Sequence, residues 1–258
     1  MAAVKGQDCN TFWVVTATEN RFYSYLIDEN GVETIPIISS VPTNIEKRGY
    51  LKLSPDGTKL AVANQGSAGS IPNSGIIYNF DNLTGIVDTD ETYLIDGIGD
   101  GQAYGIEFSV DSKKLYISTV SGFRYGLSGW EYENEIDFPG LNNPVSYKLF
   151  QFDLTATNIP NSRSLIHIQE ANSSDYPQGG YRGALQLGPD GKIYAIIPLA
   201  YEDPASFAPF LDVIENPTAD ARDIIFTKDA INLNGKFATQ GLPPFISSLL
   251  LPISISDD

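Results

Sequence analysis

Few side chains in this 258-residue sequence offer acid–base or nucleophilic chemistry. His167 is the only histidine and Cys9 is the only cysteine. A serine hydrolase triad would have to use His167, but no nucleophile-elbow motif accompanies it. His167 stands in an alternating segment, 165–169, that is typical of an outer strand. One cysteine also excludes an intramolecular disulfide and a thiolate metal cluster. We expect structural roles for both side chains.

Acidic residues offer the other chemistry to consider, which is the binding of a metal ion. Asp96 and Asp100 lie in the run Asp-Gly-Ile-Gly-Asp-Gly and supply carboxylate oxygens, the ligands that Ca²⁺ prefers. Their spacing does not follow the EF-hand pattern, and acidic turns are common in proteins without calcium. We therefore expect no cofactor, and keep a Ca²⁺ site at these two residues as the less favoured alternative.

Aromatic residues gather in one long segment, 120–146, which contains Tyr125, Trp130 and Tyr132. Tyr201 stands in a second long segment. Such side chains stack on sugar rings or anchor a protein partner. The competing interpretation is that they pack together as the small core of a long ordered loop. Both interpretations remain open from the sequence.

The elements that must position these residues come from a repeated pattern. The segments 51–63 (LKLSPDGTKLAVA), 106–118 (IEFSVDSKKLYIS) and 185–197 (LQLGPDGKIYAII) each read as a strand, a tight turn and a second strand. Recurrence of such a unit predicts a β-propeller. The aspartates of the turns, Asp56, Asp111 and Asp190, are expected to cap those turns and not to act as acids.

The predicted fold is all-β: a propeller of four-stranded antiparallel blades. About four blades and one extra inner strand fit in this chain, as part of a roughly seven-bladed ring. We expect upstream blades or a second chain to complete that ring, because closure removes exposed strand edges. The expected ranges are 1–248 for the propeller, with blades at 2–40, 49–95, 104–169 and 182–233, an inner strand at 241–246, and a tail or linker at 249–258. In the first blade, strands are predicted at 2–5, 12–18, 22–28 and 33–39, and the fourth blade is expected to end with a strand at 222–226.

Length variation among the units falls between strands two and three and at the crossings between blades. In antiparallel blades these connections share one end, so the long loops should gather there. The first strand of each blade should start at the same end, beside the central channel. Tyr104 and Arg182 stand at such starts and are suited to bind an anionic sugar or a carboxylate. Further residues at these starts are Tyr50, Gln102, Tyr181 and Gln240.

Composition limits the classes of partner. The chain carries 16 basic and 32 acidic residues, a net charge of −16, which disfavours nucleic acid and anionic membranes. Its hydrophobic content of 42% and mean hydropathy of −0.12 are ordinary for a globular protein, and it has no apolar run long enough for membrane insertion. The first residues lack the apolar core of a signal peptide, so the sequence taken literally predicts a cytoplasmic protein.

Several motifs together carry a family resemblance. They include AVKGQDCNTFWVVT, GYLKLSPDGTKLAVA, IIYNFDNLTGIV, YGIEFSVDSKKLYIS, GALQLGPDGKIYAI, LDVIENP and GLPPFI, in that order. The chain resembles, over residues 4–246, the WD40-like propeller region of secreted Bacteroidota surface proteins, which are associated with type IX secretion or gliding motility. The resemblance implies an extracellular location at the cell surface, although this chain shows no signal peptide. It supplies no catalytic residues.

Two functional classes follow. The main interpretation is a non-catalytic binding or scaffold module for adhesion, which holds a protein or glycan partner on the face with the long loops. Its contact residues would be Tyr104, Tyr125, Trp130, Tyr132, Arg182 and Tyr201. The alternative is a propeller enzyme, a lactonase-like hydrolase or a polysaccharide lyase, that acts at the mouth of the central channel.

Overall fold

The computed structural model shows an all-β protein. It describes residues 1–8, 10–46, 48–65, 74–95, 101–120, 123–126, 129–132, 146–170, 182–198 and 208–250, with the backbone alone at 123–126 and 129–132. The helices in these ranges are short 3-10 turns: η1 (Pro160–Ser162), η3 (Ala221–Asp223) and η4 (Ser247–Leu250). None of them has the length and apolar character that a membrane-crossing helix needs.

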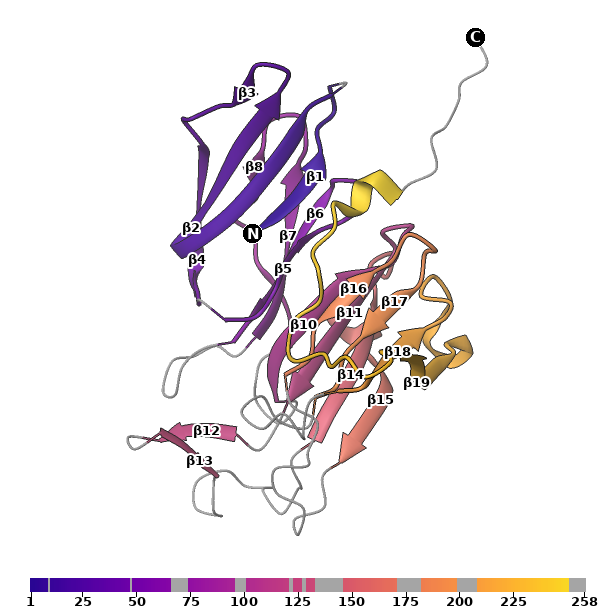
Figure 1. Ribbon diagram of the computed structural model, residues 1–258. Helices are drawn as coiled ribbons and strands as arrows, with labels where there is room; N and C mark the ends of the chain where they lie inside the picture. The colour runs from indigo at the N-terminus through magenta and orange to yellow at the C-terminus, as the bar shows by residue number, and fades with distance from the viewer. Residues whose placement is uncertain are drawn as a thin grey trace.

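Three consecutive antiparallel sheets repeat the predicted blade, and the predicted propeller fold is confirmed (Figure 1). The second unit contains β5 (Leu51–Leu53), β6 (Lys59–Asn64), β7 (Ser74–Asp81) and β9 (Thr92–Ile95), with β8 (Ile86–Val87) paired to the end of β7. The third unit contains β10 (Gln102–Phe108), β11 (Lys114–Val120), β14 (Ser146–Asp153) and β15 (Ser164–Glu170). The fourth unit contains β16 (Leu185–Leu187), β17 (Ile193–Ala195), β18 (Phe210–Ile214) and β19 (Phe226–Asn232). The number of blades in a complete ring stays a prediction.

The first unit departs from the predicted blade. Its strands are β1 (Ala2–Lys5), β2 (Phe12–Asp28), β3 (Gly31–Val32) and β4 (Ile37–Ile45). The predicted break between 18 and 22 is wrong, since β2 continues through it and pairs first with β1 and then with β4. Glu19 adopts a φ of 53° where the register with β4 shifts. A β-bulge at Glu19 therefore lets the strand continue where a break was predicted.

Two further strand predictions are wrong near the end of the chain. Residues 221–223 form η3, so the last strand of the fourth unit begins later, at Phe226. Residues 241–246 form no strand, because Pro243 and Pro244 lack the N–H groups of a β-ladder. Ser248 in η4, at the end of the predicted propeller range, accepts a hydrogen bond from the Lys5 N–H at 2.8 Å, and the boundary with the tail stays a prediction.

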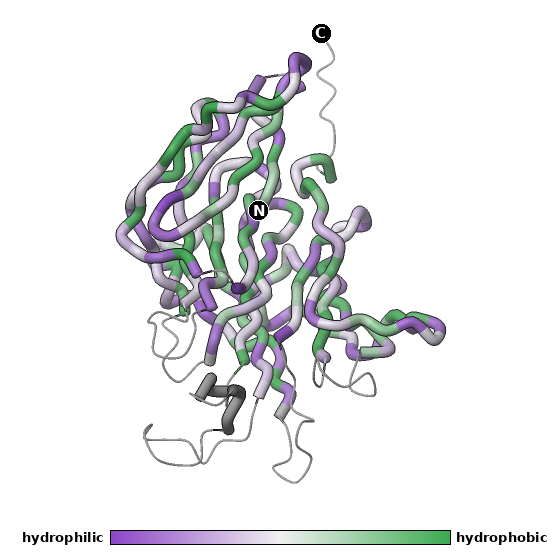
Figure 2. Tube along the Cα trace, turned by 60° about the vertical axis from the view of Figure 1, so that its left-hand side comes forward, coloured by the Kyte–Doolittle hydropathy of each residue, from purple (hydrophilic) through white to green (hydrophobic). Residues whose placement is uncertain are grey.

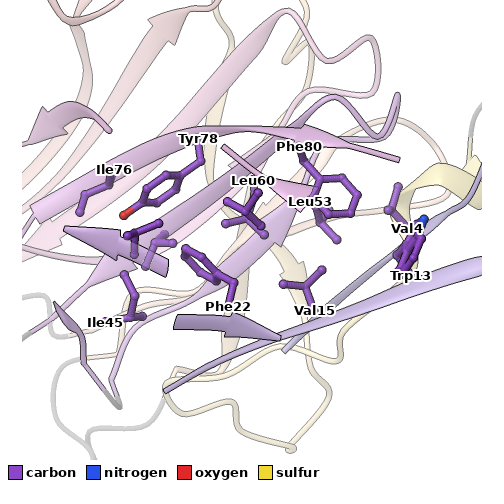
Figure 3. Close-up of a cluster of buried hydrophobic side chains, with 13 residues drawn as sticks. Val4, Trp13, Val15, Phe22, Ile45, Leu53, Leu60, Ile76, Tyr78 and Phe80 are labelled. Carbon is purple, nitrogen blue, oxygen red and sulfur yellow. The ribbon is translucent and has the colours of Figure 1, made fainter. Parts of the chain in front are cut away.

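Alternating apolar residues build the cores between the units (Figure 2). Between the first and second units, Trp13 and Phe22 pack with residues of β5, β6 and β7 (Figure 3). The Phe22 and Tyr78 rings meet edge to face, 5.2 Å apart. The Trp13 Nε1–H donates to the Asn82 carbonyl at 2.9 Å, which fixes the first unit against a turn of the second. The first unit is thus a packed part of the fold.

The aromatic segment 120–146 contains a short antiparallel ribbon. It consists of β12 (Phe123–Gly126) and β13 (Gly129–Tyr132). Tyr125 is the register partner of Trp130, and Phe123 is the register partner of Tyr132. Residues directly opposite each other share one face of a ribbon. The backbone therefore brings the predicted aromatic residues together in pairs.

Candidate functional site

The starts of the inner strands bring together side chains from distant parts of the sequence. The rings of Tyr50 and Tyr104 meet edge to face, with centroids 5.6 Å apart. The Tyr104 hydroxyl donates to Gln240 Oε1 at 3.4 Å, and Arg182 lies near enough to influence the Tyr104 phenol electrostatically. We call Tyr50, Tyr104, Arg182 and Gln240 the entrance cluster. These four residues were expected at strand starts, and the structure brings them together.

The backbone holds this cluster by close contacts between the units. Tyr50 N–H donates to the Tyr104 carbonyl at 3.1 Å, and Ala184 N–H donates to the Gln240 carbonyl at 3.0 Å. Gly183 lies so close to its neighbour that a Cβ there would stand 1.7 Å from the Ile196 carbonyl oxygen. Gly49 is similar, with the Ala63 carbonyl oxygen 1.9 Å away. Glycine at these positions is a requirement of the packing.

Burial keeps both tyrosines of the entrance cluster neutral. It raises the pKa of Tyr50, an effect that Tyr104 reinforces and the nearby Leu242 amide partly offsets. It also raises the pKa of Tyr104, partly offset by the positive charge of Arg182. A phenol with a raised pKa stays protonated at neutral pH and serves as a hydrogen-bond or proton donor. The cluster therefore combines neutral donors, aromatic surface and a buried guanidinium that is 7% exposed.

A pair of amides extends the site between the second and third units. Gln65 is 1% exposed and follows β6, and Gln102 begins β10. Gln65 Nε2 donates to Gln102 Oε1 at 2.9 Å, while Gln65 Oε1 accepts no hydrogen bond in the described part of the chain. Amide side chains are suited to recognise sugar hydroxyls because they donate and accept. Only Gln102 of this pair was expected from the sequence.

A buried polar cluster joins the inner strands of three units, and the sequence analysis missed it. Lys52 Nζ lies 2.6 Å from Glu107 Oε2 and donates to Gln186 Oε1 at 2.8 Å. Glu107 is fully buried and also accepts the Leu187 and Phe108 N–H groups. We call Lys52, Glu107 and Gln186 the inner polar cluster. They occupy the same place in LKL, IEF and LQL, and a polar residue between two apolar ones at each repeat was the signal.

The opposite end of the units carries the tight turns, and their aspartates act as predicted. Asp111 Oδ1 accepts the Ser109 hydroxyl at 2.6 Å and the Lys113 N–H at 3.2 Å. Asp56 and Asp190 accept the N–H two residues later in the same way. The prediction that these carboxylates cap their turns is confirmed.

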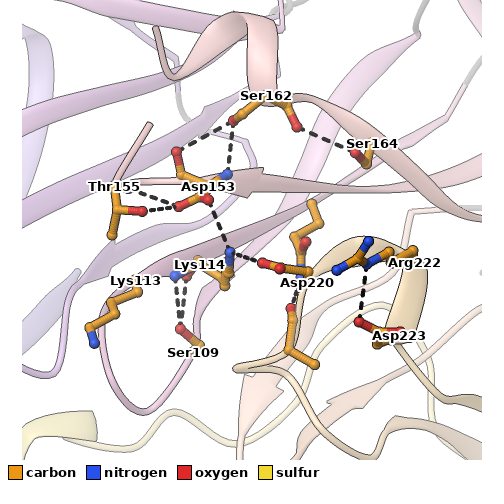
Figure 4. A network of polar contacts seen from close by, with 12 residues as sticks. Ser109, Lys113, Lys114, Asp153, Thr155, Ser162, Ser164, Asp220, Arg222 and Asp223 are labelled. Carbon is orange, nitrogen blue, oxygen red and sulfur yellow. Dashed lines mark hydrogen bonds and ion pairs between the residues drawn. The ribbon is translucent and has the colours of Figure 1, made fainter. Parts of the chain in front are cut away.

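At that same end, Lys114 connects the third unit to the fourth (Figure 4). Its Nζ lies 3.1 Å from Asp153 Oδ2 and 2.8 Å from Asp220 Oδ1. Burial alone would lower the pKa of Lys114, but its bonds to Asp220 and Asp153 outweigh it and raise that pKa. Lys114 is thus paired with a carboxylate of each unit, and this network stabilises the interface between the two blades.

His167 lies in β15, the outer strand of the third unit, as predicted. Its ring stacks on Phe226 of β19 with centroids 4.3 Å apart. Burial, and then the positive charge of Lys228, lower the pKa of His167. A neutral imidazole packed between two outer strands fits a structural role.

Other predicted residues fall outside what the structure describes. Cys9, Tyr181, Tyr201, Asp96 and Asp100 lie outside the described residues, and for Tyr125, Trp130 and Tyr132 the description stops at the backbone. Ligand contacts by these residues stay a prediction.

The described residues do not fit a metal ion at the entrance cluster. No group of three or more histidine, cysteine, aspartate or glutamate side chains within the described ranges is placed to hold one. Ca²⁺ takes about six to eight oxygen ligands, whereas this cluster offers one amide oxygen and neutral phenols beside a guanidinium that would repel a cation. We therefore draw no step through a metal.

Comparison with known proteins gives likeness in structure but not in sequence. No family model matches the chain, and no curated protein matches it. TolB from Acinetobacter baumannii is similar at 16% identity and a TM-score of 0.41, over 88% of this chain and 42% of TolB. An oligogalacturonate lyase in complex with manganese is similar at 11% identity and a TM-score of 0.46, over 90% of this chain and 53% of the lyase. The periplasmic gluconolactonase of Pseudomonas aeruginosa is similar at 16% identity and a TM-score of 0.41, over 87% of this chain and 70% of that protein.

These comparisons correct the main functional interpretation. The chain spans about half the length of TolB and of the lyase. A lyase and a lactonase are among the similar structures, and the preference for a non-catalytic scaffold is corrected accordingly. At these identities the likeness concerns the fold alone, and the chemistry must be argued from this chain's own residues.

Proposed function

We propose that this chain forms the substrate-binding part of a propeller enzyme that breaks a carbon–oxygen bond of a sugar acid. The reaction would be of the polysaccharide-lyase or the lactonase kind. The observation that carries the proposal is the entrance cluster, where one buried arginine and two neutral tyrosines from three units meet.

Each member of the cluster has a role in this proposal. Arg182 binds the carboxylate of a uronate, with which a guanidinium forms paired hydrogen bonds, or donates to the carbonyl oxygen of a lactone. Tyr50 offers its ring to an apolar face of the sugar. Tyr104, whose pKa is raised by burial, donates a proton or a hydrogen bond to the oxygen that leaves or carries developing charge. These groups bind, orient and protonate the substrate.

The location and the assembly are parts of the same proposal. The resemblance to secreted Bacteroidota surface proteins of the type IX secretion or gliding-motility kind supports an extracellular location of the protein. Further blades, from a longer protein or from a second chain, would complete the ring and supply the remaining walls of the site. Light scattering after gel filtration tests the second-chain version, which predicts twice the monomer mass.

The direct test is turnover by the wild-type protein and two variants. Oligogalacturonate is assayed for the ultraviolet absorbance of an unsaturated product, and gluconolactone is assayed for acid release. We expect activity in one assay, its loss in Arg182→Gln and a reduced kcat in Tyr104→Phe. Asp190→Ala, at the opposite end, is the control and should keep full activity. Turnover that is unchanged in Arg182→Gln would refute the proposed site.

A further inference from the structure

The segment that follows β19 returns across the inner side of the fold and contacts the entrance cluster. We call residues 240–248 the strap. Its first residue, Gln240, accepts the Tyr104 hydroxyl with its side chain and the Ala184 N–H with its carbonyl. The next residues lie against Tyr50: a Cβ on Gly241 would stand 3.3 Å from the Tyr50 hydroxyl, and the Leu242 N–H donates a hydrogen bond to that hydroxyl. The strap therefore engages both tyrosines.

The other end of the strap is anchored at the end with the tight turns. Ser247 donates its hydroxyl to the Leu53 carbonyl at 3.3 Å. Ser248 accepts the Lys5 N–H, and Leu250 packs against the core between the third and fourth units. Tyr50 directly precedes β5 and Leu53 ends it, so the strap runs the length of that strand, as the yellow trace in Figure 1 shows.

Between these anchors the strap is held weakly. No backbone N–H from Gly241 to Ile246 donates to another backbone group within the described residues, and two of these six residues are prolines. Phe245 is 54% exposed. A segment without ladder hydrogen bonds and with few buried contacts opens at low cost.

We infer that the strap is a built-in occupant of the entrance cluster, which a ligand must displace. This inference rests on the proposed function. The Gln240 carboxamide accepts the hydrogen bond that Tyr104 would otherwise give to the substrate, and the Leu242 N–H occupies the Tyr50 hydroxyl. Only molecules in which the strap is open can bind the ligand, so the apparent affinity equals the intrinsic affinity multiplied by the open fraction.

Binding of D-galacturonate, measured by calorimetry, tests the inference. Two substitutions of Gln240 are expected to change the affinity in opposite directions. Gln240→Ala removes the competing acceptor and should bind about fivefold more tightly, the factor that one ordinary hydrogen bond represents. Gln240→Glu places a carboxylate beside Tyr104 and Arg182, strengthens the seated strap and should bind more weakly than wild type. Phe245→Ala, an exposed position in the same segment, is the matched control and should bind as wild type does.

The outcomes separate the strap from the proposed function. Binding that requires Arg182 but is equal in wild type, Gln240→Ala and Gln240→Glu would overturn the strap while the proposed function stands. Weaker binding by Gln240→Ala would make Gln240 part of the site and would also overturn it. Absence of binding in wild type and in Gln240→Ala alike would overturn both. Hydrogen exchange adds an independent readout: galacturonate should accelerate exchange at Ala184, whose N–H donates to the Gln240 carbonyl, if the strap is displaced.

Discussion

Replacement of Glu107 by glutamine should destabilise the protein far more than the loss of a comparable surface ion pair. Glu107 is fully buried, and its carboxylate accepts hydrogen bonds from Lys52, Leu187 and Phe108. Glutamine keeps the shape and one acceptor oxygen, but it removes the negative charge that balances the buried Lys52 ammonium and turns an NH2 group toward one of the three donors. Removing one partner of a buried pair typically costs about 3–5 kcal/mol of the free energy of unfolding.

The matched control is Lys192→Gln. Lys192 Nζ lies 2.7 Å from Glu215 Oε2, nearly the separation of 2.6 Å in the buried pair, but the two side chains are 40% and 29% exposed. Exposed pairs contribute little because water already solvates both charges. The two variants thus compare a buried ion pair with an exposed one at nearly the same separation of nitrogen and oxygen.

Urea unfolding followed by circular dichroism measures the difference. With an m-value of about 3 kcal/mol/M, Glu107→Gln should lower the midpoint by about 1 to 1.7 M. Lys192→Gln should leave the midpoint within error. The double variant Lys52→Met/Glu107→Leu should recover part of the loss, because it leaves no buried charge. Equal midpoints for Glu107→Gln and Lys192→Gln would refute the reasoning.

Three further predictions concern other parts of the fold. His167 should titrate below its ordinary pKa in a proton NMR experiment. Because the unfolded chain then binds the proton more readily than the folded chain, the free energy of unfolding should fall as the pH drops through about 6.5. His167→Asn should remove this dependence of stability on pH. Gly183→Ala should lower the melting temperature strongly, since its Cβ would stand 1.7 Å from the Ile196 carbonyl oxygen, and a melting temperature equal to wild type would contradict that contact. Asp111→Ala should cost about 1 kcal/mol in urea unfolding by loss of its turn hydrogen bonds, without any change in galacturonate binding.

The repeated turns made most of the fold predictable. Segments such as LKLSPDGTKL specify strand, turn and strand through local rules. The three units that contain them repeat the expected four-stranded blade, with the short strand β8 added in the second. The first unit lacks such a turn. There a break was predicted between 18 and 22, but pairing with β4 keeps β2 continuous, and local sequence rules do not contain that contact between two strands.

The site was predictable only in part, for a similar reason. Position at the strand starts was enough to single out Tyr104, Arg182 and Gln240. Their contacts depend on how three units and the strap meet, which no short motif records. The ion pair of Lys52 and Glu107 joins different repeats. The two residues pair because the fold places the equivalent positions of LKL and IEF side by side, which neither repeat alone indicates.

Nitrogen-15 NMR chemical-shift mapping with D-galacturonate tests the central claim most directly. The account predicts that the amides that shift lie at 48–50, 102–104, 182–184 and 240–242, around Tyr50, Tyr104, Arg182 and Gln240. The amides of the tight turns at 54–58, 109–113 and 188–191 should not move. Shifts confined to those turns, or an unchanged spectrum at saturating galacturonate, would contradict the assignment of the site.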